Sequence, residues 1–141
     1  MYPVRGIRRK NLGETLLWSA VADGRRARLA LTLPPLNPVE VTRYKAWKQL
    51  AKEYSLPFLF EVGGDGGLSF GENLAAADGL LTTSIAEGFG MVFLESWLAG
   101  QTLVGRDLPE ITADFVSAGV DLSQLAAQLL VPLDWVGQRA F

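Results

Sequence analysis

Residues Gly79–Gly100 have the sequence GLLTTSIAEGFGMVFLESWLAG, which gives the clearest indication of the fold class. Its first part, Gly79–Ser84, is a short apolar run typical of a buried strand. Its last part, Met91–Ala99, is typical of a helix, which the following glycine ends. A strand that passes through a glycine-containing loop into a helix is the opening of a βαβ unit, and such units build parallel sheets.

The same alternation of strand and helix continues on both sides of this stretch. Further strands are expected at Tyr2–Gly6, Arg28–Leu33, Phe58–Val62 and Thr102–Gly105. Further helices are expected at residues 12–22, 39–54, 72–77 and 122–130, the first behind an N-cap at Asn11 with Glu14 completing a capping box. The sequence therefore predicts one α/β domain over residues 1–141, a Rossmann-like parallel sheet with helices on both faces.

In a sheet of this kind, ligands bind in the loops that follow the carboxyl ends of the strands. Four loops qualify, at residues 5–10, 63–71, 84–90 and 106–110. The first loop brings four cations to a helix N-terminus, where unpaired N–H groups favour an anion: Arg5, Arg8, Arg9 and Lys10. Guanidinium and ammonium groups there suit a phosphate. The alternative, a basic loop that is only solvated, stays open at this point.

Two carboxylates eight residues apart, Glu87 and Glu95, frame the start of the helix expected at Met91–Ala99. On a helix, eight residues return to within ~80° of the same direction and rise ~12 Å, so the pair suits the two ends of an extended polar ligand. Ser84-x-x-Glu87 also has the spacing of a capping box, which would make Glu87 a structural residue instead.

Glu95 is harder to explain as a structural residue. It stands in an apolar helix, where a charge is costly unless it is paired or faces a ligand. No lysine or arginine stands three or four residues away, because those positions hold Met91, Val92, Leu98 and Ala99. A ligand hydroxyl or a distant cation is then the expected partner.

The sequence GFGMVF at residues 88–93 begins like a dinucleotide-binding fingerprint. Phe93, however, occupies the position of the third glycine, which such a fold needs for close packing of helix and strand. This substitution argues against NAD or FAD, and a nicotinamide-dependent oxidoreductase domain is kept only as an alternative.

The composition removes several classes of chemistry. The 141 residues include no cysteine and no histidine, which excludes thiol nucleophiles, Ser-His triads and metal sites built on those ligands. No metal and no cofactor is expected. The net charge of -2 gives no case for a nucleic-acid partner. No apolar run approaches the ~20 residues of a transmembrane segment, and a cytoplasmic domain is expected.

The segment Ser84–Gly100, SIAEGFGMVFLESWLAG, resembles the E-x7-E signature of GT-B glycosyltransferases. It is most similar to the large, mostly retaining family typified by sucrose synthase and by bacterial mannosyl- and glucosyltransferases. Residues 76–78 and 103–107 also resemble the corresponding parts of that family, and Arg5 and Lys10 match its diphosphate-binding pair. The resemblance spans about residues 5 to 114.

The resemblance implies a role for each matching residue. Arg5 and Lys10 would bind the donor diphosphate, Glu87 would lie near the donor sugar, and these three are the expected catalytic residues. Glu95 would accept hydrogen bonds from the ribose hydroxyls. The other expected donor contacts are Ser84 and the backbone amides of Gly88, Phe89 and Gly90, with residues near Leu68 and Ser69 bordering the nucleobase.

For the chain as a whole, the resemblance implies the carboxyl-terminal half of a GT-B glycosyltransferase. This half is the donor-binding domain for a nucleotide-diphospho-sugar, and the amino-terminal acceptor domain is absent from the sequence. The expected reaction of the whole enzyme is glycosyl transfer with retention, and the chain alone is expected to be inactive. A non-catalytic nucleotide-binding or regulatory module is the alternative from another functional class.

Overall fold

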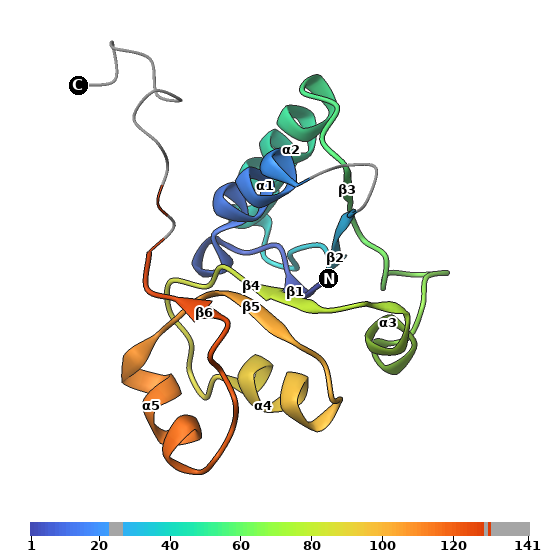
Figure 1. Ribbon diagram of the computed structural model, residues 1–141. Helices are drawn as coiled ribbons and strands as arrows, with labels where there is room; N and C mark the ends of the chain where they lie inside the picture. The colour runs from blue at the N-terminus through green and yellow to red at the C-terminus, as the bar shows by residue number, and fades with distance from the viewer. Residues whose placement is uncertain (23–26, 129, 131–141) are drawn as a thin grey trace, which may run out of the picture.

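The computed structural model describes residues 1–22, 27–128 and 130, and it has the predicted α/β architecture (Figure 1). The strands are β1 (Tyr2–Arg5), β2 (Leu29–Leu33), β3 (Phe58–Leu59), β4 (Leu80–Thr82), β5 (Leu103–Arg106) and β6 (Leu125–Ala126). The helices are the 3-10 turn η1 (Arg8–Lys10), α1 (Leu12–Val21), α2 (Pro38–Glu53), α3 (Phe70–Ala76), α4 (Met91–Leu98) and α5 (Pro109–Ser117).

The strands form two three-stranded parallel sheets, in the orders β1-β2-β3 and β4-β5-β6. The two sheets meet at β1 and β4, where the Leu81 N–H donates to the Met1 carbonyl at 2.8 Å. The strand order across this junction is therefore 3-2-1-4-5-6, and it reverses direction between β1 and β4. A reversal of strand order leaves a crevice outside the carboxyl ends of the two strands, where α/β sheets bind ligands.

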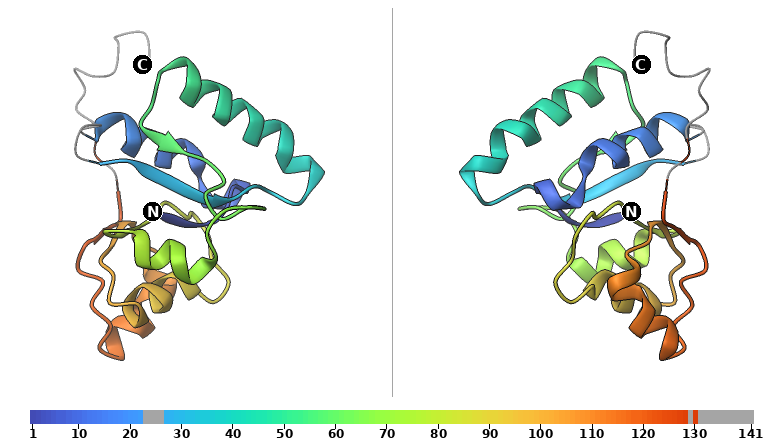
Figure 2. Two further views of the ribbon diagram at one scale, coloured as in Figure 1. Left: turned by 90° about the vertical axis from the view of Figure 1, so that its right-hand side faces the viewer. Right: turned by 90° about the vertical axis from the view of Figure 1, so that its left-hand side faces the viewer.

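The helices lie in two layers on opposite sides of the strands. Figure 2 shows α1 and α2 on one side, and α3, α4 and α5 on the other. This arrangement confirms the prediction of parallel strands with helices on both faces.

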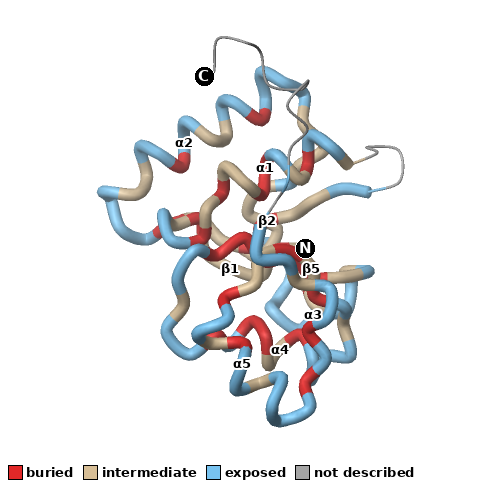
Figure 3. The backbone as a smooth tube through the Cα atoms, turned by 60° about the vertical axis from the view of Figure 1, so that its left-hand side comes forward, coloured by how far each residue is buried: buried red, intermediate tan, exposed pale blue. Residues whose placement is uncertain are grey.

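Each half of the molecule has its own apolar cluster. One cluster centres on Tyr2, Leu31 and Tyr44, and the other centres on Leu80 and Phe93. Figure 3 shows buried residues gathered along the strands, whereas most of α2 and α5 is exposed. The buried side chains of α1 include the hydroxyl residues Thr15 and Ser19. The Thr15 hydroxyl forms a hydrogen bond with that of Thr83, with an Oγ1–Oγ1 distance of 2.7 Å.

Two local predictions were wrong, and one helix was not predicted. A helix over residues 122–130 is not present in the described part of that segment, which instead contains β6, paired with β5 at Gly105 and Arg106. Helix α5 was missed, although Pro109 stands at its first turn, a common start signal. The capping box at Asn11 does not form, because Asn11 has a left-handed backbone and its side chain donates to Glu14 rather than accepting a backbone N–H.

Strand β3 is also shorter than predicted. The expected strand over Phe58–Val62 ends at Leu59, because Glu61 has a positive φ of 63° and interrupts the extended backbone. Pairing with β2 resumes beyond it, where the Val62 N–H donates to the Leu31 carbonyl at 3.2 Å. The chain therefore leaves the sheet edge through a bulge-like irregularity.

Gly105 is required where β5 passes β4. Its φ is 119°, and a Cβ at this position would overlap the Thr82 carbonyl oxygen. We predict that Gly105→Ala lowers the free energy of unfolding by about 2–4 kcal/mol, since backbone strain and overlap with a rigid neighbour add. Urea unfolding followed by circular dichroism measures this change.

Gly71→Ala is the matched control. Gly71 lies within α3, and a Cβ there would meet no atom within 4 Å. We expect this substitution to stabilise the protein slightly, by up to about 1 kcal/mol, because alanine favours the helix. Equal destabilisation by the two substitutions would contradict the close approach of β5 to β4.

Candidate functional site

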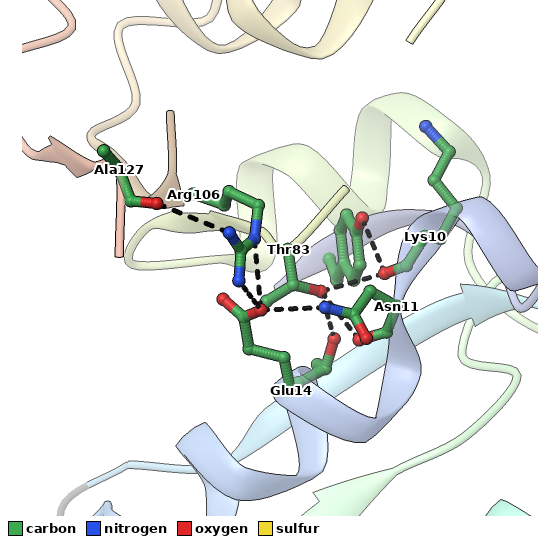
Figure 4. A network of polar contacts seen from close by, with 8 residues as sticks. Lys10, Asn11, Glu14, Thr83, Arg106 and Ala127 are labelled. Carbon is green, nitrogen blue, oxygen red and sulfur yellow. Dashed lines mark hydrogen bonds and ion pairs between the residues drawn. The ribbon is translucent and has the colours of Figure 1, made fainter. Parts of the chain in front are cut away.

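The loops that follow β1 and β4 lie side by side at the junction of the two sheets. The Ile85 N–H donates to the Arg9 carbonyl at 2.9 Å, and Thr83 Oγ1 donates to the Lys10 carbonyl at 2.9 Å. Figure 4 shows Thr83 beside the Lys10 and Asn11 backbone, with the Lys10 side chain extending away from this contact. The β1–α1 loop is therefore held in place by β4, and its side chains project from a fixed backbone.

Lys10 and Glu87, which sequence reasoning selected from different motifs, form an ion pair. The Lys10 Nζ donates to Glu87 Oε1, and the two side chains are only 10% and 7% exposed. Ser84 Oγ donates to the same carboxylate oxygen at 2.6 Å. The junction thus holds a cation, a carboxylate and a hydroxyl that are mutually paired and largely removed from water.

The hydroxyl of Tyr2 also belongs to this polar group. It lies 2.7 Å from Ser84 Oγ and 3.1 Å from the Lys10 carbonyl. Burial raises the pKa of the Tyr2 hydroxyl above its usual value, so it stays neutral. Tyr2 was not selected from the sequence as a site residue, and its place at the start of an apolar strand gave no functional signal.

The interpretation of Glu87 as a helix cap is wrong. Helix α4 begins at Met91 behind Gly90, so Glu87 lies in the loop before it, and the Ser84 hydroxyl binds the Glu87 side chain instead of a backbone N–H. Gly90 has a φ of 68°, and a Cβ there would press against Phe93 and Ile111. The loop therefore turns sharply into α4, which has no side-chain cap on its first N–H groups.

The cations of the first loop do not converge on one point. Arg5 Nη1 donates to the Pro34 carbonyl at 3.1 Å, which ties the end of β1 to the segment after β2. Arg9 Nη1 lies 3.9 Å from Glu87 Oε2, so it adds a weak second contact to the buried pair. Arg8 is exposed, and its backbone N–H donates to Glu40 Oε2 at 3.2 Å.

A second polar contact joins α1 to the end of β5. Glu14 Oε2 accepts hydrogen bonds from Asn11 Nδ2 at 2.8 Å and from Arg106 Nε at 3.1 Å (Figure 4). Arg106 Nη1 also donates to the Ala127 carbonyl at 3.4 Å. Residues at the ends of β1, β5 and β6 therefore meet at this edge. Among them, only Arg106 stood in a loop that the sequence analysis had selected.

Glu95 takes no part in the Lys10–Glu87 ion pair. It is half-buried on α4, and its carboxylate makes no hydrogen bond or ion pair with the residues that the structure describes.

Among the predicted donor contacts, Ser84 lies within the polar group, whereas Gly88 and Phe89 are exposed, Phe89 to 88%. Ser69, expected near a nucleobase, is used as the N-cap of α3, where it accepts the Glu72 N–H at 3.3 Å.

Phe93 is fully buried in the core and stacks at a tilt against Phe115, with ring centroids 6.2 Å apart. Within the described ranges, no three metal-binding side chains gather into a group, and no helix is long and apolar enough to cross a membrane.

Comparison with known proteins gives one distant relative. The chain is 29% identical over 115 residues to mannosylglucosyl-3-phosphoglycerate synthase of Petrotoga mobilis, an alignment that covers 82% of this chain and 22% of that protein. No family model matches the sequence, and no solved structure matches significantly. The chain is thus similar to part of a glycosyltransferase, and it spans about a fifth of that relative's length.

The buried ion pair leads to a prediction about stability. We expect Glu87→Gln to lower the free energy of unfolding by about 3 kcal/mol, because it leaves the Lys10 ammonium buried without an opposite charge. Adding Lys10→Met to this variant should restore much of the loss, since no unpaired charge then remains. Urea unfolding of the single and double variants measures both effects.

Lys48→Gln provides the comparison within the same chain. The Lys48 Nζ–Glu61 Oε1 distance is 3.0 Å, but these side chains are 42% and 36% exposed, so water screens the pair. Its loss should cost no more than about 1 kcal/mol. If Glu87→Gln costs no more than Lys48→Gln, the buried pair does not stabilise the junction.

Proposed function

We propose that this chain is the donor-binding part of a glycosyltransferase and binds a nucleotide-diphospho-sugar at the junction of its two sheets. The observation that carries the proposal is the pairing of Lys10 with Glu87 at the point where the strand order reverses. The similarity to a synthase of a mannosylglucosyl compound supports sugar transfer as the reaction class.

The donor diphosphate would bind to Lys10 and Arg9 and to the uncapped start of α4. The Lys10 ammonium is neutralised by Glu87 in the ligand-free protein. A diphosphate carries more negative charge than one carboxylate, so it competes for this cation, and the N–H groups of residues 88–90 add donors at a helix N-terminus. Cations held at this place also stabilise the diphosphate as it leaves the sugar.

The remaining predicted residues take the roles that the resemblance assigns. Glu87, released from Lys10, would lie beside the donor sugar with Ser84. Arg5 keeps free N–H donors after its one contact with the Pro34 carbonyl, because a guanidinium has five. Glu95, which needs a partner for its half-buried charge, would hold the ribose hydroxyls.

Transfer of the sugar requires an acceptor site as well. We infer that the whole enzyme transfers the sugar with retention and supplies acceptor-binding groups from an amino-terminal domain. The relative is about five times as long as the aligned part, which leaves room for such a domain in that protein.

The direct test is a calorimetric titration of the chain with nucleotides. We expect UDP, GDP or ADP to bind at least about tenfold more tightly than the matching monophosphate, because the second phosphate adds charge-assisted hydrogen bonds. Equal affinity for diphosphate and monophosphate would contradict the diphosphate site. Binding of NAD(H) in place of all three would favour the oxidoreductase alternative.

Glu95→Gln tests the ribose contact. We expect this variant to bind the preferred nucleotide more weakly by about 1.5–3 kcal/mol, the range for a hydrogen bond to a charged group. The loss of affinity should be smaller with the deoxyribose analogue. This analogue lacks the hydroxyl that Glu95 would bind, so neither the unmodified chain nor the variant can make that hydrogen bond. Glu53→Gln, at an exposed position near the end of α2, serves as the control and should bind normally.

A Glu95→Gln protein that binds normally but unfolds more easily would make Glu95 a structural residue. An equal loss of affinity for ribose and deoxyribose nucleotides would show that Glu95 contributes to nucleotide binding but does not contact the ribose hydroxyl.

A further inference from the structure

A hollow of about 200 Å³ lies beside the candidate site and has no role in the proposed function. It is bordered by the loop after β1, the first turn of α1 and the N-terminal half of α2, and Ile85 of the loop after β4 also lines it. An engineered cavity of about 150 Å³ holds one benzene molecule. The hollow therefore has the size of a single six-membered ring with its substituents.

Two aromatic side chains form its apolar wall. Tyr44 and Trp47 lie one turn apart on α2, and both border the hollow. Glycines allow the chain to approach them closely: a Cβ at Gly6 would overlap the Tyr44 ring, and a Cβ at Gly13 would lie 3.1 Å from the Trp47 ring. Tyr44 is thus held against the backbone of the loop after β1 and Trp47 against the start of α1. A fixed aromatic wall suits the apolar faces of a sugar ring.

The polar residues of the hollow favour an anion. Arg8 and Arg43 border it with a single carboxylate, Glu40, which already accepts the Arg8 N–H at 3.2 Å. Neither guanidinium takes part in an ion pair within the described part of the chain. Guanidinium groups bind carboxylate and phosphate through two parallel hydrogen bonds.

The start of α1 adds to this preference. Asn11 borders the hollow, has a left-handed backbone and gives α1 no side-chain cap. The first N–H groups of a helix without such a cap have no partner within the helix, and together with the helix dipole they attract negative charge. The hollow therefore combines a ring-sized volume, an aromatic wall and an excess of positive charge.

We propose that this hollow binds a hexose-sized sugar that carries one carboxylate or phosphate group, with its ring against Trp47 and its anionic group at Arg8 and Arg43. In the context of the proposed function, on which this role rests, the ligand is the acceptor, held here on one side and by the amino-terminal domain on the other. The two sites share the β1–α1 loop, because Asn11 of the hollow directly follows Lys10 of the donor site.

The experiment follows the indole N–H signal of Trp47 by NMR in the full 141-residue chain, with Trp47→Phe used to assign it. The probes are glucose 6-phosphate, glucuronate, glucose, inorganic phosphate and benzoate. We expect the two anionic sugars to shift the signal and to bind at least about tenfold more tightly than glucose or phosphate alone, since each of those lacks one half of the contacts. The two anionic sugars together distinguish a phosphate from a carboxylate preference.

Arg43→Gln and Lys45→Gln form the matched pair of variants. Both remove one positive charge from an exposed position on α2, but only Arg43 borders the hollow. Arg43→Gln should weaken binding of the anionic sugars at least about tenfold, and Lys45→Gln should leave it unchanged. Both variants should bind a nucleoside diphosphate as the unmodified chain does.

Three results would overturn the proposal: no shift of the Trp47 signal with either anionic sugar, equal effects of the two variants, or benzoate bound as tightly as the sugars. Each of these leaves the nucleotide titration, and with it the proposed function, intact. Binding of the anionic sugars without any binding of nucleoside diphosphate would support the hollow as a sugar site and remove the proposed function alone.

Discussion

The Lys10–Glu87 ion pair lies where the two sheets meet, and both of its side chains are almost out of contact with water. A buried ion pair is tolerated only when its geometry is good and its remaining hydrogen-bonding groups are satisfied. Ser84 and Tyr2 meet this condition for the carboxylate, and Thr83 fixes the Lys10 backbone. The conformation of the loops after β1 and β4 depends on this pair, because one partner comes from each loop.

The pair also relates stability to ligand binding. A ligand that takes Lys10 must replace the attraction of Glu87, and the carboxylate it releases must then find another partner. The loops can then exist in two arrangements, one with Lys10 bound to Glu87 and one with Lys10 bound to the ligand. The ligand can shift the equilibrium between them only by the difference in its affinity for the two arrangements. Under the proposed function, Glu87 therefore holds the place of the donor phosphate beside Lys10 until the ligand binds.

The sequence predicted the order of most strands and helices correctly. It predicted less well where individual helices are capped and which distant side chains meet. The spacing of Ser or Asn with Glu three residues later occurs at Asn11, Asn37, Ser69 and Ser84, and only the pattern at Ser69 forms a capping box. At Asn11 and Ser84 the glutamate binds a distant partner instead, Arg106 for Glu14 and Lys10 for Glu87. Local spacing contains no information about such partners, which the fold brings together from more than 70 residues away. Strand β6 has only two residues, too few for a periodic pattern. The hollow beside α2 is assembled from three segments that are separate in the sequence.

The position of β1 between β2 and β4 has a consequence for the order in which the chain folds. During synthesis, β1, α1, β2, α2 and β3 are made first and can pair among themselves. The second edge of β1 finds its partner only when residues 79–81 follow, as the bond from Leu81 to Met1 requires. Until then that edge presents unpaired backbone groups, which is a template for association with other chains. The first half of this protein is therefore most exposed to aggregation on the ribosome, and rapid emergence of β4 is what protects it.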